Sequence, residues 1–120
     1  MPRKTIRPLV ILSRDKPELY DNMYTGLSVE DGGGEIDVQN INHRRLLLFV
    51  SCHVDAVTVT VKKGTGPCAA STDMKFDVES NGDAVVFLES GRYLQTEGED
   101  RGKYVLQCSD QCGVSAILFD

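Results

Sequence analysis

The 120-residue sequence contains no tryptophan, and aromatic residues make up only 7% of it. A platform that stacks single-stranded nucleic acid or sugars needs several exposed aromatic rings, so this composition argues against one. Basic residues are also in the minority, because 13 Lys and Arg are set against 18 Asp and Glu, which leaves a net charge of −5. An acidic surface repels a phosphate backbone, so we expect no nucleic-acid partner.

The sequence also lacks any apolar run near the roughly 20 residues that a membrane-spanning helix needs. Its longest apolar run, residues 46–50, has the length of a single strand. The basic start at Arg3 resembles a signal peptide, but the apolar stretch that follows, residues 9–12, is ended by Arg14 and Asp15. We therefore predict a soluble protein, made in the cytoplasm, with no membrane partner.

Recognisable catalytic and metal-binding patterns are missing as well. His53 follows Cys52 directly, so in a strand the two side chains would point to opposite faces rather than form a Cys–His dyad. Cys108 and Cys112 are four residues apart, which allows a disulfide only in an oxidising compartment. Combined with Cys52 and His53, they would make a loosely spaced zinc site. We expect no disulfide framework, no metal, no cofactor and no enzyme activity, while the sequence leaves open whether Cys108 and Cys112 pair.

The sequence is instead rich in β-strand patterns. Within residues 56–62, valine alternates with threonine or lysine from Val57 onward. This alternation predicts a strand with one apolar face and one solvent-exposed face. Further strands are predicted within residues 8–14, 43–54, 74–79, 84–88, 103–108 and 114–119. Turn signals separate them at a spacing of roughly 8–12 residues, which is typical of sandwiches. We predict one all-β domain over residues 1–120, a single antiparallel β-sandwich or small barrel of about seven to eight short strands after an irregular N-terminal segment.

Turn-forming residues predict how neighbouring segments connect. Asp55 separates two β runs, so we expect these runs to pair as a hairpin, and Asn81-Gly82 predicts a second hairpin turn. Three consecutive glycines predict that residues 30–35 form a flexible turn or an exposed, glycine-rich loop. Residues 17–27 have apolar spacings of three and four, which fit a short helix or an irregular loop.

The second half of the chain carries two short blocks in a fixed order. Residues 57–66 read Val-Thr-Val-Thr-Val-Lys-Lys-Gly-Thr-Gly, and residues 89–93 read Glu-Ser-Gly-Arg-Tyr. A Gly-Lys turn at 102–103 and a last apolar strand complete the pattern. Over residues 44–120 this order resembles small head proteins of tailed bacteriophages, of the capsid decoration or cement type.

This resemblance implies a role and a set of partners. It implies a non-enzymatic β-sandwich that binds the major capsid protein on the outside of the virion, stabilises the shell and uses no cofactor. Such proteins often sit on symmetry axes, so we also expect a homo-oligomer, either a dimer or a trimer. The alternative is another virion β-sandwich module, such as a tail, baseplate or carbohydrate-binding domain.

The basic N-terminus is the region that we predict to contact the capsid. Residues 1–7 contain Arg3, Lys4 and Arg7, and would lie as an extended arm on a sheet edge or in an acidic groove of the partner. The alternative for this segment is a frayed terminus. For residues 89–93 we favour a fold-forming role, in which Tyr93 packs its ring, over a contact role.

Overall fold

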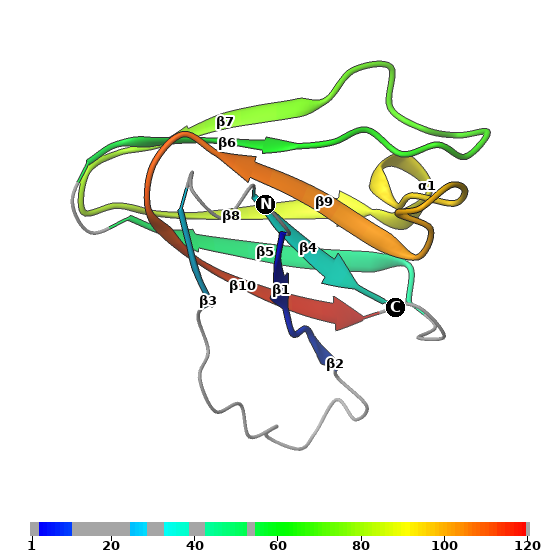
Figure 1. Cartoon of the computed structure of the whole chain (residues 1–120), viewed down its shortest axis with the longest axis horizontal. Coiled ribbons are helices and arrows are strands. Elements are labelled where there is room, and N and C mark those ends of the chain that lie inside the picture. Colours follow the sequence, from blue (N-terminus) through cyan, green and yellow to red (C-terminus); the bar gives the residue numbers. More distant parts are fainter. Residues whose placement is uncertain (1–2, 11–24, 29–32, 39–42, 53–54, 120) are drawn as a thin grey trace.

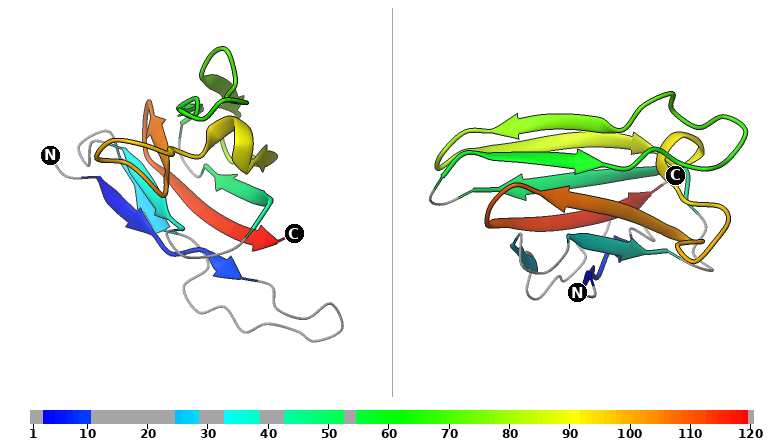
Figure 2. Two further views of the ribbon diagram at one scale, coloured as in Figure 1. Left: turned by 90° about the vertical axis from the view of Figure 1, so that its right-hand side faces the viewer. Right: turned by 45° about the horizontal axis from the view of Figure 1, so that its top comes forward.

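Two β-sheets packed face to face make up the computed structural model, which describes residues 3–10, 25–28, 33–38, 43–52 and 55–119 (Figure 1). The first sheet has the strand order β1 (Lys4–Ile6), β4 (Gly34–Asp37), β9 (Lys103–Cys108), β6 (Val57–Val61) and β7 (Met74–Val78). The second sheet has the order β2 (Leu9–Val10), β10 (Cys112–Phe119), β5 (Arg45–Ser51) and β8 (Asp83–Glu89), and β3 (Thr25–Leu27) also pairs with β10. The predicted all-β sandwich is confirmed, and Figure 2 shows its two layers.

The described residues contain ten strands rather than seven or eight, and their sheets are open rather than closed into a barrel. The additional strands are β1, β3 and β4, which are only three or four residues long, whereas β2 lies within the strand predicted at residues 8–14. Two pairings are parallel, β1 with β4 and β2 with β10. The one helix in the described segments is α1 (Ser90–Tyr93), and no helix there has the length and apolar character to span a bilayer.

The core lies between the sheets and is built from alternate residues of each strand. The valines of β6 are predicted to face one way, and Val57, Val59 and Val61 are all at most 1% exposed. Each buried Val or Leu side chain contributes about 1.5–3 kcal/mol to stability. Tyr104 on β9 is also fully buried, and its hydroxyl lies 2.8 Å from His43 Nε2, so its polar end is satisfied. Burial raises the pKa of Tyr104, which therefore stays neutral.

The predicted hairpin at Asp55 is wrong, because β5 and β6 lie in different sheets. Each strand has an apolar side that faces the core, and the two strands belong to the opposite layers of the sandwich rather than pairing edge to edge. The hairpin predicted at Asn81-Gly82 is also wrong, although a turn is present there, with Asn81 at φ 60° and a 2.8 Å hydrogen bond from the Gly82 N–H to the Glu79 carbonyl. This turn joins β7 to β8, which also belong to opposite sheets.

The prediction of an exposed glycine loop over residues 30–35 is wrong for its described part. Gly33 and Gly34 are buried, and β4, which begins at Gly34, lies inside the first sheet between β1 and β9. A Cβ on Gly34 would come within 2.9 Å of Leu27 Cδ1 and 3.0 Å of Ile6 Cδ1. Glycine therefore lets the side-chain ends of Ile6 and Leu27 pack closely against β4. Residues 30–32 and 17–24 lie outside the described residues.

The predicted arm at residues 1–7 is also corrected over its described part. Lys4–Ile6 pair in parallel with β4, and the Lys4 N–H donates a 3.1 Å hydrogen bond to the Gly33 carbonyl. Ile6 is 1% exposed, so its burial in the core holds this segment against the sandwich. Residues 3–6 therefore belong to the body of the sandwich, while residues 1–2 lie outside the described part of the chain.

Candidate interaction surface

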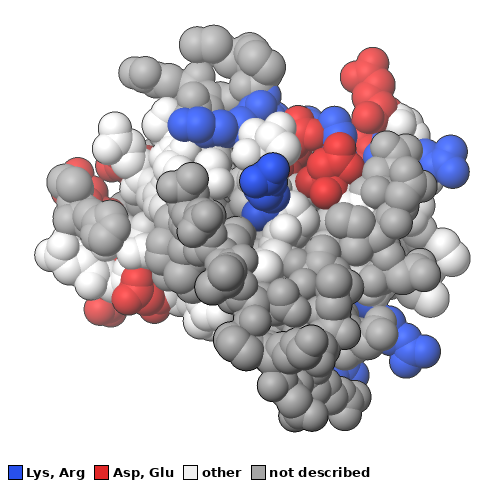
Figure 3. Space-filling view, turned by 90° about the horizontal axis from the view of Figure 1, so that it is seen from below, with Lys and Arg blue, Asp and Glu red and all other residues white. Residues whose placement is uncertain are grey.

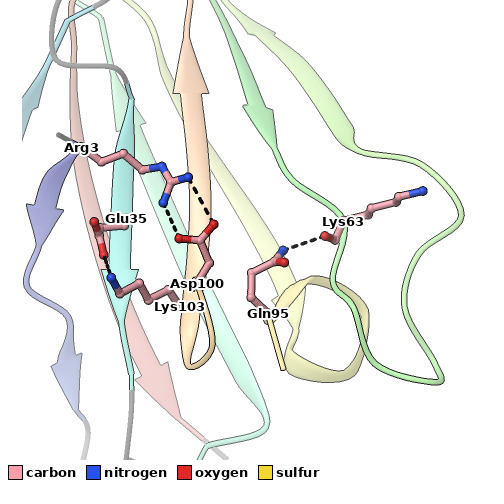
Figure 4. A network of polar contacts seen from close by, with 6 residues as sticks. All are labelled: Arg3, Glu35, Lys63, Gln95, Asp100 and Lys103. Carbon is pink, nitrogen blue, oxygen red and sulfur yellow. Dashed lines mark hydrogen bonds and ion pairs between the residues drawn. The ribbon is translucent and has the colours of Figure 1, made fainter. Parts of the chain in front are cut away.

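The outer surface of the first sheet is polar and carries two ion pairs. Lys103 Nζ lies 2.6 Å from Glu35 Oε2, and the Arg3 guanidinium holds both oxygens of Asp100 at 2.6 and 3.2 Å (Figure 4). These bonds raise the pKa of Lys103 and lower the pKa of Asp100. Positive and negative side chains also adjoin on the flank seen in Figure 3. This sheet presents an ordinary solvated surface.

A small pocket of about 170 Å³ lies on the same surface. It is lined by Arg3, Thr60, Lys62, Asp73, Val105 and Gln107. Two of its charged residues already have partners, because Arg3 binds Asp100 and the Asp73 carboxylate accepts a 2.8 Å hydrogen bond from the Lys63 N–H. The pocket therefore shares Arg3 and Asp73 with the polar contacts of this surface.

The outer surface of the second sheet is apolar where β5 and β8 meet. The register places Leu47 opposite Phe87 and Phe49 opposite Val85. Alternate residues along the two strands, including the fully buried Leu48 and Leu88, point into the core, so these four side chains point outward. We call Leu47, Phe49, Val85 and Phe87 the β5–β8 face. Antiparallel sandwiches normally have polar residues on such a surface, so an apolar one indicates a binding surface.

Exposure on this surface is greatest at the sheet edge. Val85 is 56% exposed and Phe87 60% exposed, whereas Leu47 and Phe49 are half-buried. Further into the sheet, Ser115 on β10 lies opposite Phe49 and is fully buried. Among the described residues its hydroxyl is the one buried side-chain oxygen without a hydrogen-bond partner. The open part of the surface therefore lies over β8 and the adjacent half of β5.

The predicted contact residues lie away from the β5–β8 face, in the first sheet or beside it. Arg3 binds Asp100, a residue 97 positions away in the sequence, so its guanidinium has a structural partner. Lys4 lies on β1 with an exposed side chain, and Arg7 is exposed in the link between β1 and β2. The structure therefore brings the three residues to one end of the sandwich without forming a joint cationic site.

The two blocks that carry the resemblance meet in space. Glu89 ends β8, and residues 90–93 form the single turn α1, in which Tyr93 is 6% exposed and the Arg92 guanidinium lies 5.9 Å from its ring. The Arg92 carbonyl accepts hydrogen bonds from the N–H groups of Gly64 at 2.8 Å and Ala70 at 3.1 Å. A Cβ on Gly64 would lie 2.9 Å from that carbonyl oxygen. This close contact agrees with the fold-forming role favoured for residues 89–93.

The four cysteines are all free thiols. Cys52 and Cys112 are buried, Cys108 is half-buried and Cys68 is exposed. A hydrogen bond with the Cys108 thiol, together with burial, raises the pKa of Cys112, and the Cys52 thiol donates to the Asp55 carbonyl. Within the described part of the chain, no three His, Cys, Asp or Glu side chains are grouped so that they could hold a metal ion, and His53 lies outside that part.

Thiol reactivity tests this arrangement. We expect Cys68 to react fastest with a disulfide reagent at pH 8, because it is exposed, while Cys52 and Cys112 react slowly in the native protein. Unfolding should release all four thiols, and C68A should remove the fast phase. The measurement is reaction with dithionitrobenzoate, with peptide mapping of the labelled sites. Fast labelling of Cys112 would contradict its burial and its raised pKa.

Sequence reasoning missed the β5–β8 face, although a signal was present. Residues 84–88 and 46–50 are continuous apolar runs, whereas a strand with one solvent-exposed side should alternate.

Comparisons of the chain with protein-family models, with curated protein sequences and with solved structures return no match.

Proposed function

We propose that the chain is a non-enzymatic head protein of a tailed bacteriophage, which binds the major capsid protein on the outside of the virion and stabilises the shell. The β5–β8 face carries this proposal, because it combines two exposed large apolar side chains, Val85 and Phe87, on a sandwich whose opposite surface is polar. Burying such side chains against a partner contributes about 1.5–3 kcal/mol each, which is a substantial part of a micromolar affinity.

The resemblance over residues 44–120 supports the choice of partner. Its two blocks, residues 57–66 and 89–93, contact each other through the Gly64–Arg92 hydrogen bond, so both belong to one structural unit. A rigid sandwich with a preformed apolar surface suits decoration, because little conformational entropy is lost when it binds. On the shell the protein acts as a dimer or trimer around a symmetry axis, after its synthesis in the host cytoplasm.

Capsid co-sedimentation tests the proposal. The protein, mixed with expanded empty capsids of its own phage, should sediment with them and raise the temperature at which they disrupt, as measured by scanning calorimetry. Bound ligands stabilise the state that they bind, so the shift should grow with protein concentration until the sites are filled. Protein that stays in the supernatant and leaves the capsid transition unchanged would rule this function out.

A further inference from the structure

The flank of the sandwich formed by β7 and β8 is less completely covered than the opposite flank. β7 and β8 are the edge strands of their sheets among the described residues, and both lie on this side (Figure 2). Their core-facing residues Phe76 and Val86 are only half-buried. On the opposite flank Ile6 and Ile36 are at most 1% exposed. The core is therefore open along β8.

The backbone of β8 presents hydrogen-bonding groups to that opening. The Cys52 N–H binds the Gly82 carbonyl and the Ser90 N–H binds the Arg44 carbonyl, both at 3.0 Å, which sets the alternation of the β5–β8 ladder. Even-numbered residues of β8 therefore bond to β5, and the N–H and C=O of Val85 point to the open edge. β8 contains neither proline nor lysine, the residues that commonly protect an edge from further pairing.

Charge around the edge selects the kind of strand that fits. Asp83 and Glu89 stand exposed at the two ends of β8, with Glu79 near the first of them. Of these, Glu89 lies opposite Arg45 on β5. If two β8 strands paired antiparallel in full register, Asp83 of each copy would face Glu89 of the other. Like charges opposite each other destabilise a strand pair, so a second copy fits poorly.

We propose that β8 accepts an extended, β-branched segment of another protein, with basic residues at its ends, as an additional strand of the second sheet. The added backbone pairs with Val85, its inward side chains cover Phe76 and Val86, and its basic ends face Asp83 and Glu89. This rests on the proposed function only in that a capsid subunit supplies the strand. A dimer or trimer of the protein then uses surfaces other than the β8 edge.

Binding of a peptide to the full chain, monitored by the amide NMR signals of the protein, tests this directly. One probe is Lys-Lys-Val-Thr-Val-Thr-Val-Lys-Lys, and its matched control has Glu at the four Lys positions. We expect the Lys-ended peptide to bind at least about tenfold more tightly than the Glu-ended one, an advantage that falls in high salt. The shifted amides should centre on β8, with new exchange protection at the Val85 N–H. Equal affinities, shifts confined to other strands, or no binding would overturn the proposal.

Variants separate strand addition from a general apolar contact. V85P removes an edge-facing N–H without removing a bond to β5, and V85K places a like charge beside the Lys-ended peptide. Each should weaken peptide binding at least about tenfold, while Q107K, which adds the same charge to the outer surface of the first sheet, should leave it unchanged. V85K keeps the test valid if V85P fails to fold. Unchanged affinity of a folded V85K would contradict the proposal.

The outcome is distinguishable from failure of the proposed function. Peptide binding at β8 without capsid binding would reject the capsid role and retain strand addition. Capsid binding that V85K abolishes but a folded V85P retains would reject strand addition and keep the β5–β8 face as the capsid-binding surface. Sedimentation equilibrium adds a further check, because a wild-type dimer that V85K dissociates would show that a second copy occupies the edge and would overturn the proposal.

Discussion

Replacing Gly33 with alanine should lower the free energy of unfolding by about 3 kcal/mol. This is the largest loss that we expect for a glycine-to-alanine substitution among the described glycines. Gly33 has φ 95°, a conformation that L-residues rarely adopt, and adopting such a conformation costs roughly 1–2 kcal/mol. The new Cβ would also overlap the backbone carbonyl of Leu106 on β9. Overpacking of this kind costs about 1–3 kcal/mol, and a backbone atom within a sheet cannot move aside easily.

The matched control is G26A. Gly26 lies in β3 with an exposed position, and a Cβ there meets no atom within 4 Å. Alanine should therefore leave stability within about 0.5 kcal/mol of wild type or raise it slightly, because it reduces the entropy of the unfolded chain. Urea denaturation of both variants measures the difference. Equal stabilities of G33A and G26A would show that the close approach of Gly33 to β9 is not real.

The second large effect is expected for L48A. Leu48 is fully buried in the centre of β5, between Val86 of β8 and Ala116 of β10. Truncating a buried leucine to alanine removes apolar contacts and leaves a cavity, which typically costs about 2–5 kcal/mol. Because sheet neighbours on both sides restrict collapse of this cavity, we expect a loss of about 3 kcal/mol, measured by urea denaturation.

The adjacent residue gives the control for L48A. Leu47 makes the same chemical change possible one position along the strand, but it points outward and is half-buried. L47A should therefore cost at most about 1 kcal/mol. A larger loss for L47A than for L48A would mean that the register of β5 is shifted by one residue, since such a shift exchanges the two faces of a strand.

The sequence allowed strands to be predicted far better than their partners. The alternation of Val57, Val59 and Val61 predicted the buried side of β6, and the limits predicted for β9, residues 103–108, agree with the structure. Alternation, however, reports only which side of a strand is apolar. Whether two apolar sides pair in one sheet or face each other across a core depends on contacts that are distant in sequence, and so the hairpin at Asp55 was predicted wrongly.

The candidate surface was hidden for a related reason. Arg3 could be recognised as a cation from the sequence, but its ion pair with Asp100 depends on the fold. Gly34 was attributed to a loop because glycine permits turns, whereas its role is to allow Ile6 and Leu27 to approach the backbone. The continuous apolar run of β8 was a usable signal, but only the structure shows that this strand lies at an edge with Val85 and Phe87 outward.

The central claim is that the β5–β8 face, rather than the polar sheet opposite, binds the capsid. Co-sedimentation of V85K and Q107K with expanded empty capsids tests it most directly, because both variants add one positive charge at exposed positions on opposite sheets. We predict that V85K lowers capsid occupancy at least about tenfold and that Q107K binds like wild type. Wild-type occupancy for V85K, or a loss of binding for Q107K alone, would contradict the claim.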